Sequence, residues 1–93
     1  MAYKVLLHDA VVRALNNLDA ITKERIKKGL RVLEPDPYRK RPGADIKKLK
    51  GTKGRQDAYR LRIGDYRAIY DVSDSTVKVT RLQHRGEGYD WLN

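Results

Sequence analysis

The feature that most constrains this chain is an alternation of apolar and charged residues on both sides of the pair Gly64-Asp65. Residues 59–63 and 66–72 each repeat with a period of two, which is typical of strands with one apolar and one polar face. A two-residue turn with glycine first fits a type II′ turn. The segment therefore predicts an antiparallel β-hairpin, and the fold must include a sheet with a buried face.

The register of this hairpin determines which side chains meet across it. A two-residue turn places Ile63 opposite Tyr66 and Arg62 opposite Arg67, so that Arg60 shares a face with both of these arginines. Side chains directly opposite each other have Cβ atoms about 5 Å apart, and like charges at that separation are destabilising. The pattern therefore favours an anion between the arginines, because guanidinium groups bind phosphate oxygens in a planar fork.

Two amphipathic helices are predicted between a short strand at residues 3–8 and the prolines Pro35 and Pro37, which stop the second helix. Asp9 is the expected N-cap of the first helix and Asp19 that of the second. The two helices should form a hairpin joined by few residues. Their apolar positions recur at the spacing of one helix face, and they are Val11, Ala14, Leu15 and Leu18 in the first helix and Thr22, Ile26, Gly29, Leu30 and Leu33 in the second.

The remaining segments complete the predicted fold. Residues 38–56 are punctuated by proline and glycine and are expected to form a long loop, with Ile46 and Leu49 as anchors. Residues 76–83 should form another strand, in which the opposite parity of Val79 and Leu82 indicates either a β-bulge or burial on both faces. The expected architecture is a single α+β domain over residues 1–93, with a small antiparallel sheet packed against an N-terminal helical hairpin in the order β-α-α-β-β-β.

The positive charge of the chain is concentrated in one stretch. The 93 residues include 21 Lys and Arg against 12 Asp and Glu, which gives a formal net charge of +9. Residues 39–67 hold eleven basic and three acidic residues, so this stretch accounts for nearly all of the excess. A concentrated basic segment points to a polyanionic partner rather than to a general solubility trait.

Composition disfavours several classes of site. The sequence has no cysteine and only two histidines, His8 and His84, which lie far apart. Neither a disulfide framework nor a zinc site is expected, and no metal or cofactor is predicted. The chain has no apolar run long enough to span a membrane and no signal-peptide pattern at its N-terminus. A cytoplasmic protein without a membrane partner is therefore expected.

Some of the charged residues allow a plainer interpretation. The arginine face could be a solvated strand face that Asp57 or Asp71 neutralises in part. A single histidine beside an arginine, such as His84 next to Arg85, is more often a surface residue than a catalytic one. The basic cluster before the hairpin is explained equally well by a solvated loop and by phosphate contacts, and it consists of Lys47, Lys48, Lys50, Lys53 and Arg55.

Taken in order, these features resemble the RelE/ParE toxin superfamily, and more narrowly RelE, the messenger-RNA interferase of type II toxin–antitoxin systems. The resemblance covers almost the whole chain and agrees with the fold expected above. It implies an antiparallel sheet with two N-terminal helices packed on it. The matching segments are the opening Met-Ala-Tyr, Lys48-Leu49-Lys50-Gly51, Tyr59-Arg60-Leu61-Arg62, Asp65-Tyr66-Arg67-Ala68-Ile69-Tyr70, and His84-Arg85 through Tyr89.

The resemblance also implies an activity and partners. Members of the family cleave messenger RNA in the ribosomal A site. The partners implied are the ribosome, the message and a cognate acidic, RelB-like antitoxin, in a complex expected to be heterotetrameric. The basic cluster would contact RNA or the ribosome. The catalytic residues implied by position are Arg60, Arg62, Arg67, Arg85 and Tyr89, with His84 in second rank.

The chemistry of RNA is compatible with such a set. RNA carries its own nucleophile, the 2′-hydroxyl, so arginines that bind the charge of the transition state can support cleavage without a metal. Which residue transfers the proton stays open, since tyrosine has a reference pKa of about 10 and the strand parity of His84 can turn it away from Arg85. Two alternatives remain, a ParE-like toxin that inhibits DNA gyrase and a basic RNA- or ribosome-binding module without catalysis.

Overall fold

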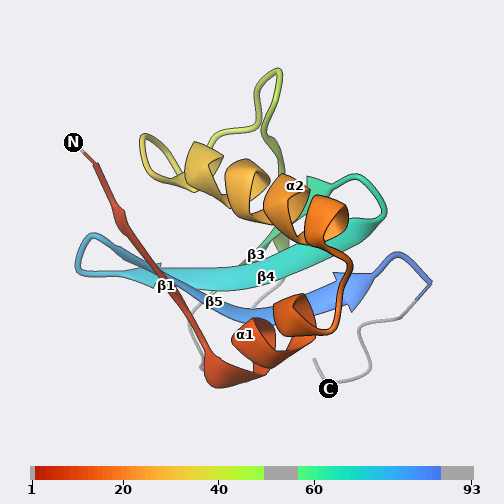
Figure 1. Cartoon of the computed structure of the whole chain (residues 1–93). Coiled ribbons are helices and arrows are strands. Elements are labelled where there is room, and N and C mark those ends of the chain that lie inside the picture. Colours follow the sequence, from red (N-terminus) through yellow and green to blue (C-terminus); the bar gives the residue numbers. More distant parts are fainter. Residues whose placement is uncertain (1, 50–56, 87–93) are drawn as a thin grey trace.

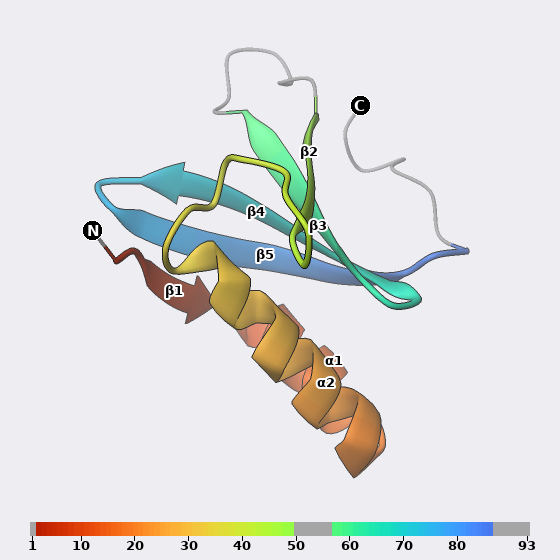
Figure 2. The same cartoon turned by 90° about the horizontal axis from the view of Figure 1, so that it is seen from above.

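The computed structural model describes residues 2–49 and 57–86. In this part of the chain, two helices lie on one face of a five-stranded sheet (Figure 1, Figure 2). No helix in it is long and apolar enough to cross a membrane. The elements in chain order are β1 (Lys4–Leu7), α1 (Asp9–Asn16), α2 (Ala20–Leu30), the 3-10 turn η1 (Arg31–Leu33), β2 (Asp45–Leu49), β3 (Ala58–Ile63), β4 (Tyr66–Ser73) and β5 (Thr76–His84).

The sheet is mixed, with the strand order β1-β5-β4-β3-β2. The α+β class and the packing of both helices on the sheet are confirmed. The antiparallel pairing predicted for β3, β4 and β5 is confirmed, whereas β1 pairs parallel with β5. Parallel neighbouring strands need a long crossover connection between them. The helices and the three intervening strands provide that connection between β1 and β5.

The predicted loop at residues 38–56 contains a strand that the sequence analysis missed. β2 pairs antiparallel with β3 and forms one edge of the sheet. Ile46 and Leu49 are both buried, as expected of anchors. They lie on opposite faces of β2, because Ile46 pairs with Leu61 and Leu49 with Ala58. This odd spacing within five residues conceals the period of two that identifies a strand.

The two helices begin at different kinds of cap. The Asp19 carboxylate accepts a hydrogen bond from the Thr22 backbone N–H at 3.0 Å, which confirms it as the N-cap of α2. At α1 the predicted cap was wrong. His8 is the N-cap, its Nδ1 accepting from the Ala10 N–H at 3.0 Å, and Asp9 is the first helical residue. An imidazole nitrogen satisfies the same exposed backbone donor that a carboxylate would, and Asp9 stays where the helix dipole favours negative charge.

The hairpin of β3 and β4 has the predicted register, with Arg62 opposite Arg67. Gly64 has a positive φ of 57°, as the first position of a type II′ turn requires. Between β4 and β5 the register shifts after Ile69, which pairs with Arg81, while the next residue pairs with Val79. This is a β-bulge, one of the two explanations that the sequence left open.

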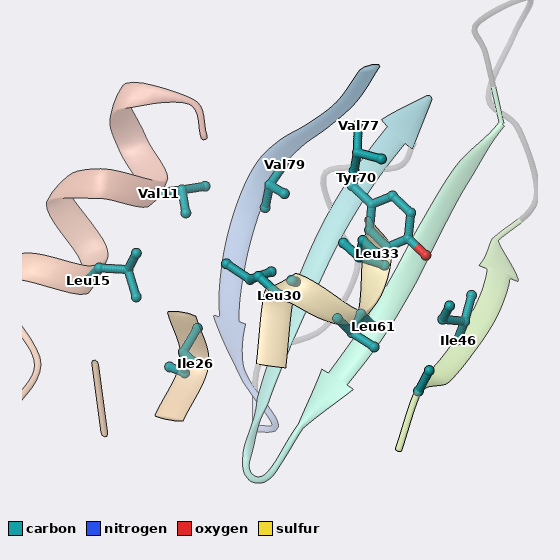
Figure 3. Close-up of a cluster of buried hydrophobic side chains, with 12 residues drawn as sticks. Val11, Leu15, Ile26, Leu30, Leu33, Ile46, Leu61, Tyr70, Val77 and Val79 are labelled. Carbon is teal, nitrogen blue, oxygen red and sulfur yellow. The ribbon is translucent and has the colours of Figure 1, made fainter. Parts of the chain in front are cut away.

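A single apolar layer holds the helices to the sheet (Figure 3). α1 contacts β5 and α2 contacts β3. Gly29 allows the close approach of α2, since a Cβ there would lie 2.9 Å from Cγ2 of Ile63. Ile63 immediately precedes the turn, so this contact also fixes the position of the hairpin. The buried side chains drawn in Figure 3 include Val11, Leu15, Ile26, Leu30, Leu33, Ile46, Leu61, Tyr70, Val77 and Val79.

Leu61→Ala should lower the free energy of unfolding by about 2 to 5 kcal/mol, because Leu61 is 1% exposed and its removal leaves a cavity. Urea unfolding followed by circular dichroism measures the change. Arg62→Ala, at the exposed next position of the same strand, is the matched control and should unfold at the same urea concentration or slightly higher. Equal losses in the two variants would contradict the assignment of the two faces.

Candidate functional site

The face of the sheet turned away from the helices, called the outer face here, carries most of the predicted catalytic arginines. Strand pairing sets Arg62, Arg67 and Gln83 side by side across β3, β4 and β5. On the other side of Arg62, Asp45 of β2 completes the row. A second row, one step farther from the turn, consists of Lys47, Arg60, Ile69 and Arg81.

The facing pair of Arg62 and Arg67 is the main electrostatic feature of the outer face. Arg62 is exposed and Arg67 is half-buried. Among the described residues, Arg62 forms no ion pair. Two guanidinium groups held opposite each other by backbone pairing repel, and an anion between them would relieve that repulsion. The pair is therefore a candidate anion site whose spacing is fixed by the sheet itself.

Arg60 is held differently from the other arginines. Its side chain is only 16% exposed, and a terminal nitrogen (Nη2) donates to Oδ1 of Asp45 at 2.8 Å. Its Nε is buried and has no hydrogen-bond acceptor among the described residues. The expected neutralising residues were Asp57 or Asp71, but Asp57 pairs with Lys48 at 3.0 Å. Asp45 fills that role because β2 brings it alongside β3.

Arg85 lies against the turn of the same hairpin. Its backbone N–H donates to the carbonyl oxygen of Asp65 at 2.7 Å, and its guanidinium is 3.6 Å from the Asp65 carboxylate. Both side chains of this ion pair are more than 60% exposed, so the pair leaves the guanidinium accessible. Since Gln83 pairs with Arg67, the end of β5 brings Arg85 to the same end of the sheet as the facing arginines.

His84 belongs to the other face. It pairs with Tyr66 across β4 and β5, and the two rings meet edge to face with centroids 5.3 Å apart. Tyr66 is opposite Ile63 and shares the helix-covered face with it. The parity of β5 therefore directs His84 away from Arg62 and Arg67, as the sequence suggested, and the arginine site does not include it.

The predicted basic cluster is divided between the faces. Lys47 pairs with Arg60 and lies on the outer face, whereas Lys48 pairs with Tyr59 on the helix-covered face. The hydrogen bond from Lys48 to Asp57 raises the pKa of Lys48. Tyr89 and the rest of the cluster, which is Lys50, Lys53 and Arg55, lie outside the described residues.

Two residues of the outer face were not singled out from the sequence. Asp45 was assigned to a loop, and only the short run Asp45–Leu49 could have revealed it as a strand residue. Gln83 is 3% exposed and pairs with Arg67. Its spacing of two residues from Arg85 is the sequence pattern that could have placed it on the same face as that arginine. The described residues contain no cluster of three or more carboxylates and histidines able to hold a metal ion.

Comparison with known proteins places this arrangement in a family. The model of the ParE toxin of type II toxin–antitoxin systems matches residues 5–89. The chain belongs to the RelE/ParE superfamily of type II toxins. It is similar to Toxin RelE3 of Methanocaldococcus jannaschii, with 31% identity over 89 residues, which cover 96% of this chain and 98% of that toxin. Putative toxin RelE1 of the same organism is 33% identical, over 95% of this chain and 94% of its own length.

The fold agrees with that of solved RelE proteins. The crystal structure of the RelE–RelB complex from Pyrococcus horikoshii matches with a TM-score of 0.77 and 38% identity, covering 95% of this chain and all of that chain. The RelB–RelE complex from Methanococcus jannaschii gives a TM-score of 0.68 at 27% identity, covering 95% and 99% of the two chains. The RelE names of these relatives identify the chain as a RelE-like toxin.

In this RelE-like toxin, Asp45→Ala should lower the free energy of unfolding by about 1 to 3 kcal/mol, because it leaves the half-buried Arg60 without its acceptor. The matched control is Asp57→Ala, which removes an ion pair whose side chains are 61% and 46% exposed and should cost under about 1 kcal/mol. Chemical denaturation at moderate salt compares the two. A decrease in the free energy of unfolding that is larger for Asp57→Ala than for Asp45→Ala would contradict a stabilising role of the Arg60–Asp45 ion pair.

Proposed function

We propose that this toxin is a ribosome-dependent endoribonuclease of the cytoplasm that cleaves messenger RNA in the A site and so inhibits translation. The observation that supports the proposal most directly is the facing pair Arg62 and Arg67, with Arg85 at the same end of the sheet. Three cations grouped around one hairpin are suited to a phosphate that gains charge during reaction. The similarity to relatives named RelE supports the RelE branch of the superfamily over the ParE branch.

The proposed reaction uses the nucleophile that RNA supplies. The 2′-hydroxyl loses its proton, and its oxygen forms a bond to the adjacent phosphorus. The bond from phosphorus to the 5′ oxygen breaks, that oxygen gains a proton, and the products are a 2′,3′-cyclic phosphate and a 5′-hydroxyl. Arg62, Arg67 and Arg85 bind the transition state better than the ground state, because the phosphoryl oxygens gain charge between the two.

Arg60, Tyr89 and the basic residues have supporting roles in this proposal. Arg60 is tied to Asp45, so it contributes fixed positive charge beside the phosphate rather than a mobile contact. Tyr89 acts on the RNA base or the 2′-hydroxyl. The ribosome holds the message in a reactive geometry, which leaves the toxin chiefly to stabilise charge. RNA and the ribosome are contacted by the basic cluster of Lys47, Lys48, Lys50, Lys53 and Arg55.

Arg67→Ala should reduce single-turnover cleavage on programmed ribosomes roughly 30- to 1000-fold at saturating toxin, since a contact made in the transition state is lost. Lys47→Ala, on the same face but one row away, should weaken association modestly and leave the saturated rate nearly unchanged. Arg13→Ala, on α1, is the distant control and should change neither quantity. Equal saturated rates for Arg67→Ala and the unchanged toxin would remove the arginine pair from the mechanism.

The same samples separate the alternative functions. Primer extension on translated messages shows cuts at codon positions if the toxin is an interferase. DNA breaks that depend on gyrase would instead identify a ParE-like inhibitor of gyrase. Ribosome or RNA binding without either product would identify a basic binding module that has no catalytic activity.

The second part of the proposal is that an acidic RelB-like antitoxin neutralises the toxin in a heterotetrameric complex. The P. horikoshii and M. jannaschii relatives were solved in complex with RelB. This chain offers a groove between β1 and α2 that is lined by both apolar and charged side chains. Ile21, one of the apolar lining residues, is 73% exposed. The lining residues are Val5, Leu7, Ile21, Glu24, Arg25, Lys27, Lys28, Leu30, Arg31 and Glu34.

Ile21→Ala should weaken binding of the co-expressed RelB-like antitoxin about 5- to 30-fold, because burial of that side chain contributes on the order of 1 to 2 kcal/mol. Val12→Ala is the matched control, an exposed apolar residue of α1 outside the groove. Isothermal titration of each purified variant measures the affinities. An unchanged affinity for Ile21→Ala, or an equal loss for Val12→Ala, would exclude the groove as the docking site.

A further inference from the structure

A chain of tyrosine rings reaches the surface on the helix-covered face of the sheet, at the end far from the Gly64 turn. Tyr70 is fully buried and stacks on Tyr59, with centroids 5.7 Å apart and planes 19° apart. Tyr38 meets Tyr59 edge to face at 5.5 Å and Tyr3 at 6.1 Å. Tyr38 itself is 47% exposed. These four rings are called the tyrosine platform below.

The loop that carries Tyr38 is fixed by hydrogen bonds. The Asp36 carboxylate accepts from the backbone N–H of Tyr38 at 2.9 Å and of Arg39 at 3.2 Å, and the first of these bonds lowers the pKa of Asp36. Arg41 donates to the carbonyl oxygens of Val32 and Asp36 at 2.6 and 3.0 Å. The exposed ring is therefore held in one place before any partner arrives, which reduces the entropy that binding would cost.

Exposed cations neighbour the tyrosine platform in the chain and across the sheet. Arg39 and Lys40 follow it in the chain, and both are exposed. Lys48 is the cross-strand partner of Tyr59 and is 61% exposed. The carboxylates nearby are Asp36 and Asp57, each already in an ion pair, with Arg39 at 3.7 Å and Lys48 at 3.0 Å. Glu34, whose carbonyl oxygen accepts from the Tyr3 N–H at 2.7 Å, is a third carboxylate, and the four cations Arg39, Lys40, Arg41 and Lys48 still exceed the carboxylates, so the local charge is positive.

We propose that the tyrosine platform is a second RNA-binding site, in which an unpaired base stacks on Tyr38 while neighbouring phosphates contact Arg39, Lys40 and Lys48. The inference rests on the proposed function for its choice of RNA. Stacking on a fixed aromatic ring beside cations is how proteins bind single-stranded RNA without reading its sequence. An acidic peptide would use the cations but would leave the ring unused, so RNA accounts for more of the surface.

The platform is separate from the arginine site in both face and position. Tyr59 and Tyr70 pair at the far end of the hairpin from Gly64, and they share the face that the helices cover. Arg62 and Arg67 lie near the turn and on the outer face. One RNA phosphate cannot contact both sites, so the platform anchors a different nucleotide from the one that is cleaved.

The test is a binding titration of the full-length toxin carrying Arg62→Ala and Arg67→Ala, which weakens the cleavage site. The probe is fluorescein-labelled oligouridylate, compared with a ribose-phosphate chain of equal length that lacks bases. Removal of the bases should weaken binding roughly 5- to 100-fold, the contribution expected of base–aromatic stacking. Equal affinity for the two chains would overturn the proposal, and this comparison keeps Tyr38 intact, so it does not depend on the folding of a variant.

Substitutions in the same background assign the effect to the ring. With Tyr38→Leu added, the double variant should bind oligouridylate as weakly as the double variant alone binds the chain without bases. With Tyr38→Phe added, it should bind oligouridylate as tightly as the double variant alone, because stacking needs no hydroxyl. Leu6→Ala, at a residue of similar exposure on β1, is the control and should change nothing. Undiminished oligouridylate binding by a folded Tyr38→Leu variant would overturn the proposal. So would the finding that polyglutamate displaces the labelled probe as well as unlabelled oligouridylate does. Failure of ribosomal cleavage by the unchanged toxin would instead count against the proposed function alone.

Discussion

The pairing of β3 with β4 is the constraint on which the other features of this toxin depend. A strand that slips by one residue turns every side chain to the opposite face. In this hairpin a slip would place Leu61 in solvent and Arg62 in the core. The turn at Gly64 and the contact of Gly29 with Ile63 hold the register. Burial of the apolar face therefore fixes the arginines on the other face, although those arginines repel one another.

The outer face shows two ways of accommodating positive charge. Arg60 is half-buried beside the buried Ile69, its partner across the hairpin, and it has a carboxylate 2.8 Å away. A charge in such surroundings needs a permanent partner, because the cost of removing it from water is large. Arg62 is exposed to water, which screens its repulsion from Arg67 across the hairpin.

The sequence was sufficient to predict the parts of the fold that local patterns determine. The hairpin register, the cap at Asp19 and the buried stripe through Ile26 and Leu30 follow from spacing within a few residues, and all three are confirmed. The parallel pairing of β1 could not be predicted in this way, since its partner strand lies some seventy residues away. β2 was missed because its short sequence puts one apolar residue on each face.

The same limit applied to the candidate site. The three hairpin arginines were placed on one face correctly, because parity alone decides that. Asp45 was not identified as the partner of Arg60, because fifteen residues separate them and only the edge strand brings them together. His8 rather than Asp9 is the cap, because two adjacent polar side chains leave the first helical residue uncertain by one position in the sequence. Local patterns thus predict which face a residue occupies better than they predict which residue it meets.

The basic stretch of the sequence also divides into two surfaces once it is folded. Lys47 and Lys48 are adjacent in the chain, but β2 is an edge strand with solvent on both faces at that point, and its pleat sends one lysine to Arg60 and the other to Tyr59. Charge density along a sequence therefore overstates the charge density at either surface. A single strand can serve two sites on opposite faces, because alternate side chains are independent of each other. In this toxin, the excess positive charge of residues 39–67 is thus divided between the outer face and the helix-covered face of the sheet.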